Sequence, residues 1–186
     1  MLFIPAAVPP HKPAADLAPA PDRFEMTRLA VAAHPRFAVS DVEMARPGAS
    51  YTVDTLRALA EGGDALFLLI GSDTFLDLSH WKAPREVAAL ARVVVVPRTG
   101  DGFDPAGPAA RAVLEDLGLD AFTRDGTGPG RGPIVVPAAS LPISGSDLRR
   151  RAREGRSLAY RMPESVIAYV RARGLYRAPS PAPATA

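Results

Sequence analysis

Residues 66–81 read LFLLIGSDTFLDLSHW, and this stretch predicts the fold of the chain. Its first five residues form an apolar run short enough for a strand buried on both faces, as is typical of parallel sheets. Gly71 ends the run where the backbone must turn, Asp73 follows, and residues 74–78 predict a short helix before Trp81. Ligands bind beside strand ends in open α/β sheets, so we expect a crevice near Gly71 and Asp73.

The flanking segments predict a parallel α/β fold. Apolar residues at helical spacing predict helices at 53–61 and 85–91, and the runs at 93–96 and 134–136 predict further apolar strands. A strand, a helical crossover and a second strand form a βαβ unit, and such units build parallel sheets. We therefore expect one doubly wound domain over residues 1–176.

The N-terminal segment predicts a strand followed by a stiff loop. Residues 2–4 predict a short strand, and a proline-rich loop then presents His11 and Lys12. A stiff backbone loses less entropy when it clamps an anion, so these two side chains are candidate anion ligands. A surface loop with incidental charges is the alternative.

The next segment carries two helix-start signals. Asp22 and Glu25 have the spacing of a capping box before a helix, and residues 37–42 alternate as in a strand. Hydroxyl groups at Ser50 and Thr52 favour capping of the helix at 53–61, and contact with a ligand is compatible with that role.

A second informative stretch, ISGSDLR, spans residues 143–149. Ser144 and Asp147 have capping-box spacing, which predicts a helix that begins here and carries Arg149. Free N–H groups, hydroxyls and an arginine at a helix start can hold phosphates. A further helix is predicted from Glu164 to Gly174, and residues 177–186 are expected to form a disordered tail.

Composition excludes several classes of protein. There are no cysteines, and the three histidines lack carboxylates at ligand spacing, so no zinc site is predicted. Residues 131–186 carry 10 basic and 3 acidic side chains, whereas residues 1–130 carry 12 basic and 17 acidic ones. Few aromatics accompany the basic residues, which favours phosphates over nucleic acid as the ligand, with a solvated basic helix as the alternative. Neither a signal peptide nor a membrane span is predicted, so we expect a cytoplasmic protein.

These motifs together resemble bacterial nicotinate-nucleotide adenylyltransferase, and their order and gaps agree from residue 2 to residue 176. The matching segments are Ile4-Pro5, Pro9-Pro10-His11-Lys12, Arg23 with Met26, Ser50-Tyr51-Thr52, Asp54-Thr55-Leu56, Gly71-x-Asp73, Trp81, Arg98, Ile143-Ser144 with Arg149, and Gly174-Leu175-Tyr176.

The resemblance implies a Rossmann-like nucleotidyltransferase fold and transfer of AMP from ATP, with Mg²⁺, to nicotinate mononucleotide. It implies ATP binding by one set of residues, with Arg149 stabilising phosphate charge, and mononucleotide binding by another, with Trp81 stacked on the pyridine ring. The ATP set is Gly71, Asp73, Ile143, Ser144, Ser146 and Arg149. The mononucleotide set is His11, Lys12, Ser50, Tyr51, Thr52, Trp81, Lys82 and Arg98. No nucleic-acid or membrane partner is implied, and self-association is left open.

One departure from the family pattern affects the expected activity. The family begins with a glycine-rich strand and a helix bearing His-x-Gly-His, and none of His11, His34 and His80 has that spacing. We therefore expect a fold that lacks its first strand and helix, strand edges left unpaired beside apolar surface, and weak catalysis. A non-catalytic nucleotide-binding module is the alternative. In a generic doubly wound domain, Trp81 would be a core residue.

Overall fold

The computed structural model describes residues 1–10, 17–98, 100, 102–124, 131–138 and 141–177. The chain divides into two compact units, which are described separately. Unit 1 contains Met1–Ser50 and Pro142–Ala186, and unit 2 contains Tyr51–Leu141. The expectation of a single domain over residues 1–176 stays a prediction, and the expected tail from 178 onward lies outside the described residues.

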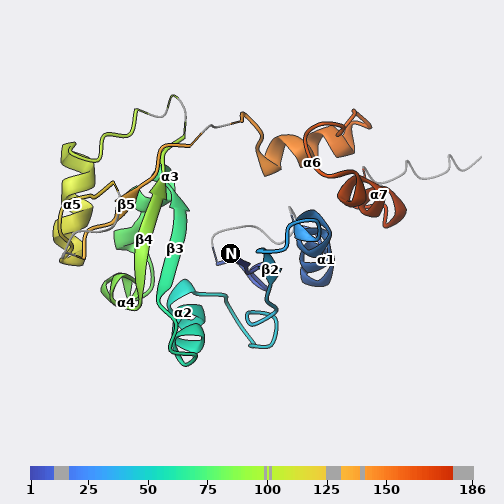
Figure 1. The fold of residues 1–186 in the computed structure, drawn as a ribbon. Helices are drawn as coiled ribbons and strands as arrows, with labels where there is room; N and C mark the ends of the chain where they lie inside the picture. The colour runs from blue at the N-terminus through green and yellow to red at the C-terminus, as the bar shows by residue number, and fades with distance from the viewer. Residues whose placement is uncertain (11–16, 99, 101, 125–130, 139–140, 178–186) are drawn as a thin grey trace, which may run out of the picture. The chain divides into compact units, whose positions relative to one another are not determined.

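Unit 2 is built on a three-stranded parallel sheet with the order β3-β4-β5 (Figure 1). Leu66 on β3 is aligned with Ala91 on β4, and Val94 on β4 with Ile134 on β5. The expected parallel α/β arrangement is confirmed. The strands are β3 (Leu66–Gly71), β4 (Ala91–Val96) and β5 (Ile134–Val135).

Five helical segments accompany this sheet in the described part of unit 2. Apolar side chains of these segments and of the sheet build one core, in which Val53, Phe75, Leu78, Val87 and Val95 are completely buried. The segments are α2 (Thr52–Ala60), α3 (Ser72–Leu76), the 3₁₀ helix η2 (Leu78–His80), α4 (Pro84–Leu90) and α5 (Pro108–Leu117).

The expectation that strand β3 is buried on both faces is wrong. Leu66, Leu68 and Ile70 pack against the core, whereas Phe67 and Leu69 are 55% and 47% exposed. Successive side chains of a strand point to opposite faces, so the whole of one face is open. Within the described residues β3 is an edge of its sheet. Two unpaired strand edges beside exposed apolar surface were expected; β3 supplies one such edge, and the second stays a prediction.

Unit 1 combines elements from both ends of the sequence. A two-stranded parallel sheet pairs Leu2 on β1 with Ala38 on β2, and the predicted strand at 37–42 is therefore shorter than expected. The elements are β1 (Leu2–Phe3), α1 (Ala20–Val31), β2 (Ala38–Val39), α6 (Gly145–Arg153) and α7 (Glu164–Ala172).

The predicted capping box at the start of α1 is wrong. The helix begins at Ala20 after Pro19 and has no side-chain cap, so Asp22 lies inside its first turn. Asp22 is 4% exposed and accepts hydrogen bonds from Tyr169 Oη at 2.7 Å and from Arg173 Nε at 3.1 Å. This carboxylate therefore joins α1 to α7 instead of capping α1.

The cap predicted for α6 is confirmed, and the one predicted for α2 is not. Ser144 Oγ accepts a hydrogen bond from the backbone N–H of Asp147 at 3.1 Å. Thr52 is itself the first residue of α2, and that helix start has no side-chain cap. In the part of the chain that the structure describes, no helix is both long and apolar enough to cross a membrane.

Candidate functional site

The carboxyl end of β3 carries a short hydrogen-bonded cluster. Ser72 is buried, and its Oγ accepts a hydrogen bond from the backbone N–H of Arg98 at 3.3 Å. Asp73 Oδ2 lies 3.3 Å from Arg98 Nη2. A Cβ atom on Gly71 would stand 2.6 Å from Asp73 Oδ1, so glycine allows the carboxylate to fold back over the end of the strand. Three predicted site residues, Gly71, Asp73 and Arg98, thus come together here.

A hollow of about 300 Å³ opens beside this cluster in unit 2. Asp73 and Leu76 line it on one side, and Phe103 lines it on the other. The Phe103 ring packs edge-on against Phe75 and Phe122 at centroid distances of 6.1 and 5.8 Å, which fixes this wall. The hollow has the size of a small-molecule site and lies where a crevice was expected, while its role in ligand binding stays a prediction.

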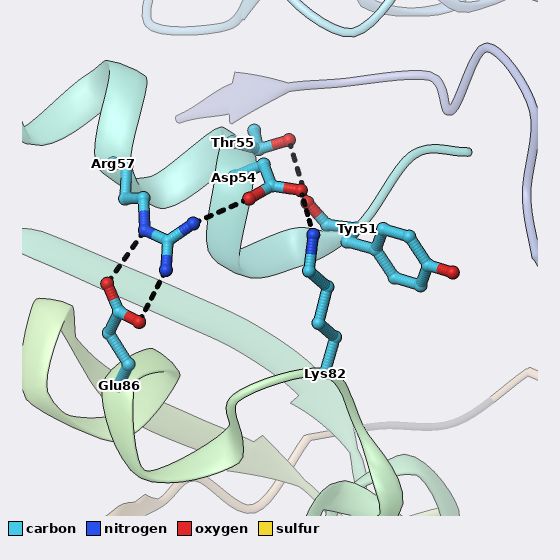
Figure 2. Close-up of polar contacts among 6 residues, drawn as sticks. All are labelled: Tyr51, Asp54, Thr55, Arg57, Lys82 and Glu86. Carbon is cyan, nitrogen blue, oxygen red and sulfur yellow. Dashed lines mark hydrogen bonds and ion pairs between the residues drawn. The ribbon is translucent and has the colours of Figure 1, made fainter. Parts of the chain in front are cut away.

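The start of α2 and the turn that follows η2 are joined by charges (Figure 2). Lys82 Nζ lies 2.9 Å from Asp54 Oδ2 and 4.5 Å from the centroid of the Tyr51 ring. Trp81 is partly buried and packs against the core of unit 2. Four predicted mononucleotide residues, Tyr51, Thr52, Trp81 and Lys82, therefore lie on these two segments.

Helix α2 is also joined to α4 by charged side chains. Arg57 donates to Glu86 through Nε and Nη2 at 2.7 and 2.6 Å, and to Asp54 Oδ1 through Nη1 at 2.8 Å. These hydrogen bonds lower the pKa of Glu86 below its usual value and raise the pKa of Arg57. Sequence reasoning missed this network, although Asp54 precedes Arg57 by three positions, as ion-paired residues on one helix face do.

The start of α6 gathers the predicted phosphate ligands of unit 1. Ser144 caps the helix, and Arg149 Nη2 donates to Ser146 Oγ at 3.1 Å. Arg150 donates to Asp147, and this bond is the main reason that the pKa of Asp147 lies below its usual value. Free N–H groups, two hydroxyls and a guanidinium thus face one helix end, an arrangement suited to phosphate oxygens.

Arg149 also borders a small hollow of about 130 Å³ in unit 1. Its lining includes the apolar side chains of Leu148, Met162 and Val170, together with Met26 and Tyr176.

Ser50 organises the loop that follows β1. Its Oγ accepts hydrogen bonds from the N–H groups of Ala7 and Val8 at 3.0 and 3.2 Å. Arg23 holds the same loop by donating to the carbonyl oxygens of Ala6 and Ala7, and burial lowers the pKa of Arg23. Sequence reasoning gave Arg23 no role.

Two predicted mononucleotide ligands cannot be placed, and the other two histidines were not among the candidates. His11 and Lys12 lie outside the described residues. His34 stacks on Phe37 at 3.9 Å between ring centroids, and His80 Nδ1 lies 3.3 Å from Asp77 Oδ1. Both predicted ligand sets draw on both units, and their complete composition stays a prediction.

Comparison with known proteins agrees with these motifs. The Cytidylyltransferase-like family profile matches residues 1–151. A protein of Geotalea uraniireducens named probable nicotinate-nucleotide adenylyltransferase is 39% identical over 95% of this chain and 83% of its own length. A protein of Thermus thermophilus with the same name is 40% identical over 95% of this chain and 83% of its own length.

The fold has a counterpart among solved structures. Nicotinic acid mononucleotide adenylyltransferase of Plasmodium falciparum, complexed with NaAD, matches with a TM-score of 0.69. The match covers 94% of this chain and 81% of that one, at 15% sequence identity. This likeness concerns the fold, and it confirms the expected nucleotidyltransferase type.

Proposed function

Since the chain belongs to the nicotinate-nucleotide adenylyltransferase family, we propose that it transfers the adenylyl group of ATP to nicotinate mononucleotide. A phosphate oxygen of the mononucleotide attacks the α-phosphorus of ATP, and the bond from that phosphorus to the bridging oxygen of the β-phosphate breaks. The products are nicotinate adenine dinucleotide and pyrophosphate. The observation that carries this proposal is identity of about 40% with enzymes of that name over 95% of the chain.

The start of α6 supports the ATP side of the reaction. Negative charge grows on the departing pyrophosphate, and prearranged donors lower the barrier when they face that charge. Ser144, Ser146 and Arg149 supply such donors at a helix end whose dipole favours anions. In this proposal Arg149 contacts the phosphates directly, and Gly71 and Asp73 line the nucleotide side.

The α2 start and the turn after η2 support the mononucleotide side. In the proposal the Trp81 ring stacks on the pyridine, and Thr52 and the backbone N–H groups near residue 82 receive the carboxylate. Ser50 and Tyr51 border this part of the site, and Arg98, with His11 and Lys12, meets the mononucleotide phosphate. Lys82 is already paired with Asp54, so it contributes chiefly by holding its own turn in place.

We also propose Mg²⁺ as the divalent ion that accompanies ATP, since nucleotidyl transfer generally uses such an ion. In the part of the chain that the structure describes, no three His, Cys, Asp or Glu side chains gather closely enough to hold a metal. Mg²⁺ is often bound mainly by substrate phosphates and water, so in this proposal the ion arrives with ATP. Cytoplasmic location and self-association stay predictions.

The test is pyrophosphate release from ATP in the presence of nicotinate mononucleotide or nicotinamide mononucleotide. We expect release that requires the nicotinate form, and a loss of about 10²-fold to 10³-fold in rate for Arg149→Ala. Arg153→Ala is the matched control, because Arg153 is exposed on the same helix.

Quenching of Trp81 fluorescence by nicotinate mononucleotide separates an enzyme from a binding module. Trp81 is the only tryptophan, so the signal reports one ring. Quenching without pyrophosphate release would favour the non-catalytic module. If the mononucleotide caused no quenching and no pyrophosphate were released, the proposal would be refuted.

A further inference from the structure

Four charged side chains link the first turn of α2 to the start of α4 (Figure 2). Lys82, Asp54, Arg57 and Glu86 alternate in sign, with N···O distances of 2.9, 2.8 and 2.6 Å between successive members. Asp54 occupies the centre, because its two oxygens accept from two different cations. Removing the Asp54 charge would therefore break the contact to Lys82, whereas removing the Glu86 charge would not.

The contact to Lys82 fixes the turn that carries Trp81. Lys82 follows Trp81 directly, and its ammonium is held between the Asp54 carboxylate and the face of the Tyr51 ring. Asp54 is the better shielded partner, with 27% of its side chain exposed, against 47% for Lys82. The turn is thus attached to α2 two residues after Thr52, the first residue of that helix.

The backbone beside Lys82 supports this interpretation. Ala83 has φ 49° and ψ 56°, a left-handed conformation that costs free energy for any residue with a Cβ atom. Such a conformation persists when its surroundings hold it. The Lys82–Asp54 pair precedes Ala83, and Pro84 begins α4 directly after it. The turn therefore has a fixed shape.

We propose that Asp54 is a positioning residue for the mononucleotide. By holding Lys82, it keeps the Trp81 ring at a constant separation from the first turn of α2, so that one ligand can meet both. Asp54 itself does not touch the ligand. The inference rests on the proposed function, because it assigns the pyridine to Trp81 and the carboxylate to Thr52.

Steady-state kinetics of Asp54→Asn test the proposal. The change keeps the shape of the side chain and removes its charge. We expect the KM for nicotinate mononucleotide to rise about tenfold, equivalent to about 1.4 kcal/mol, while the KM for ATP changes by less than about twofold. Lys82→Met should have the same effect, and the double variant should be no worse than either single one.

Glu86→Gln is the matched control. It breaks the Arg57–Glu86 pair, which joins the same two helices, and leaves the Lys82 contact in place. The KM for the mononucleotide should stay within about twofold of the parent value. If Glu86→Gln raised the KM for the mononucleotide as much as Asp54→Asn does, Asp54 would be only a general stabilising residue. The same conclusion would follow if Asp54→Asn raised the KM values for the mononucleotide and for ATP equally.

Trp81 fluorescence tests positioning without any turnover. In the ligand-free protein, Asp54→Asn and Lys82→Met should each raise the acrylamide quenching constant of Trp81 about twofold, and Glu86→Gln should not. If these changes in quenching were found but the protein released no pyrophosphate, the proposed function would be refuted. The role of Asp54 in positioning Trp81 would still be supported. Unchanged quenching in Asp54→Asn would overturn the positioning role even in an active enzyme.

Discussion

Replacing Tyr169 with phenylalanine removes one hydroxyl from the contact between α1 and α7. That hydroxyl donates at 2.7 Å to Asp22 Oδ1, which is also the acceptor for Arg173 Nε at 3.1 Å. Because Asp22 is only 4% exposed, water does not fully replace the lost donor. The substitution therefore leaves a buried carboxylate with one partner fewer.

The expected cost follows from the type of bond. A hydrogen bond to a charged group contributes about 1.5–3 kcal/mol, and Arg173 remains on the same oxygen, so we expect a loss of about 1.5–2 kcal/mol at pH 7. For a chain of this length the melting temperature should fall by about 3–8 °C.

The loss should also depend on pH. The hydrogen bond from Tyr169 is the largest cause of the lowered pKa of Asp22, with Arg173 adding to it against the opposing effect of burial. A carboxyl whose pKa is lowered in the folded state stabilises the fold above its unfolded pKa of about 3.9. That contribution disappears as pH falls through the folded-state pKa, so the deficit of Tyr169→Phe should shrink below about pH 4.

Urea denaturation at pH 7 and pH 3, followed by circular dichroism, measures this deficit. Tyr160→Phe is the control, because Tyr160 is fully exposed and loses the same hydroxyl. An equal deficit at both pH values would refute the charge-assisted bond. A comparable loss of stability in Tyr160→Phe would show that the cost of Tyr169→Phe does not come from the hydrogen bond to Asp22.

Two further predictions concern the stability of unit 2. Phe67→Ala should cost less than about 1 kcal/mol, and Phe75→Ala about 3–5 kcal/mol, because Phe67 is 55% exposed and Phe75 is completely buried. Similar costs in chemical denaturation would mean that the outer face of β3 is covered. Ala83→Gly should raise the free energy of unfolding by about 0.5–1 kcal/mol, because glycine adopts the left-handed conformation freely, whereas Ala89→Gly inside α4 should lower it by about as much. Equal signs for the two substitutions would contradict the assigned backbone conformation.

Local patterns predicted the elements of unit 2 well. The strand expected at 66–70 is β3 (Leu66–Gly71), and the helix expected at 85–91 is α4 (Pro84–Leu90). Both segments are bounded by glycine, which permits tight turns, or by proline, which restricts φ, and both effects act locally. Exposure was harder to predict, because a run of apolar residues does not show which of its two faces is covered.

Contacts between distant residues were not predictable from local spacing. Asp22 matched a capping box by its distance from Glu25, and its actual partner Tyr169 lies 147 positions away. The pairing of Lys82 with Asp54 likewise spans 28 positions. Spacing predicts neighbours on one helix, whereas these contacts depend on which helices pack together. Most candidate ligands were instead named from the family resemblance, which needs no knowledge of which helices pack together, and they stay predictions.

The composition of unit 1 determines when its parts become stable during synthesis. Unit 2 is a continuous segment, so all of its internal contacts are available once residue 141 has left the ribosome. Helix α1 is made before unit 2, but its buried carboxylate gains Tyr169 and Arg173 only when α7 emerges after unit 2. Residues 1–50 therefore wait through the synthesis of unit 2 for their contacts with α7. During that interval Asp22 remains in water.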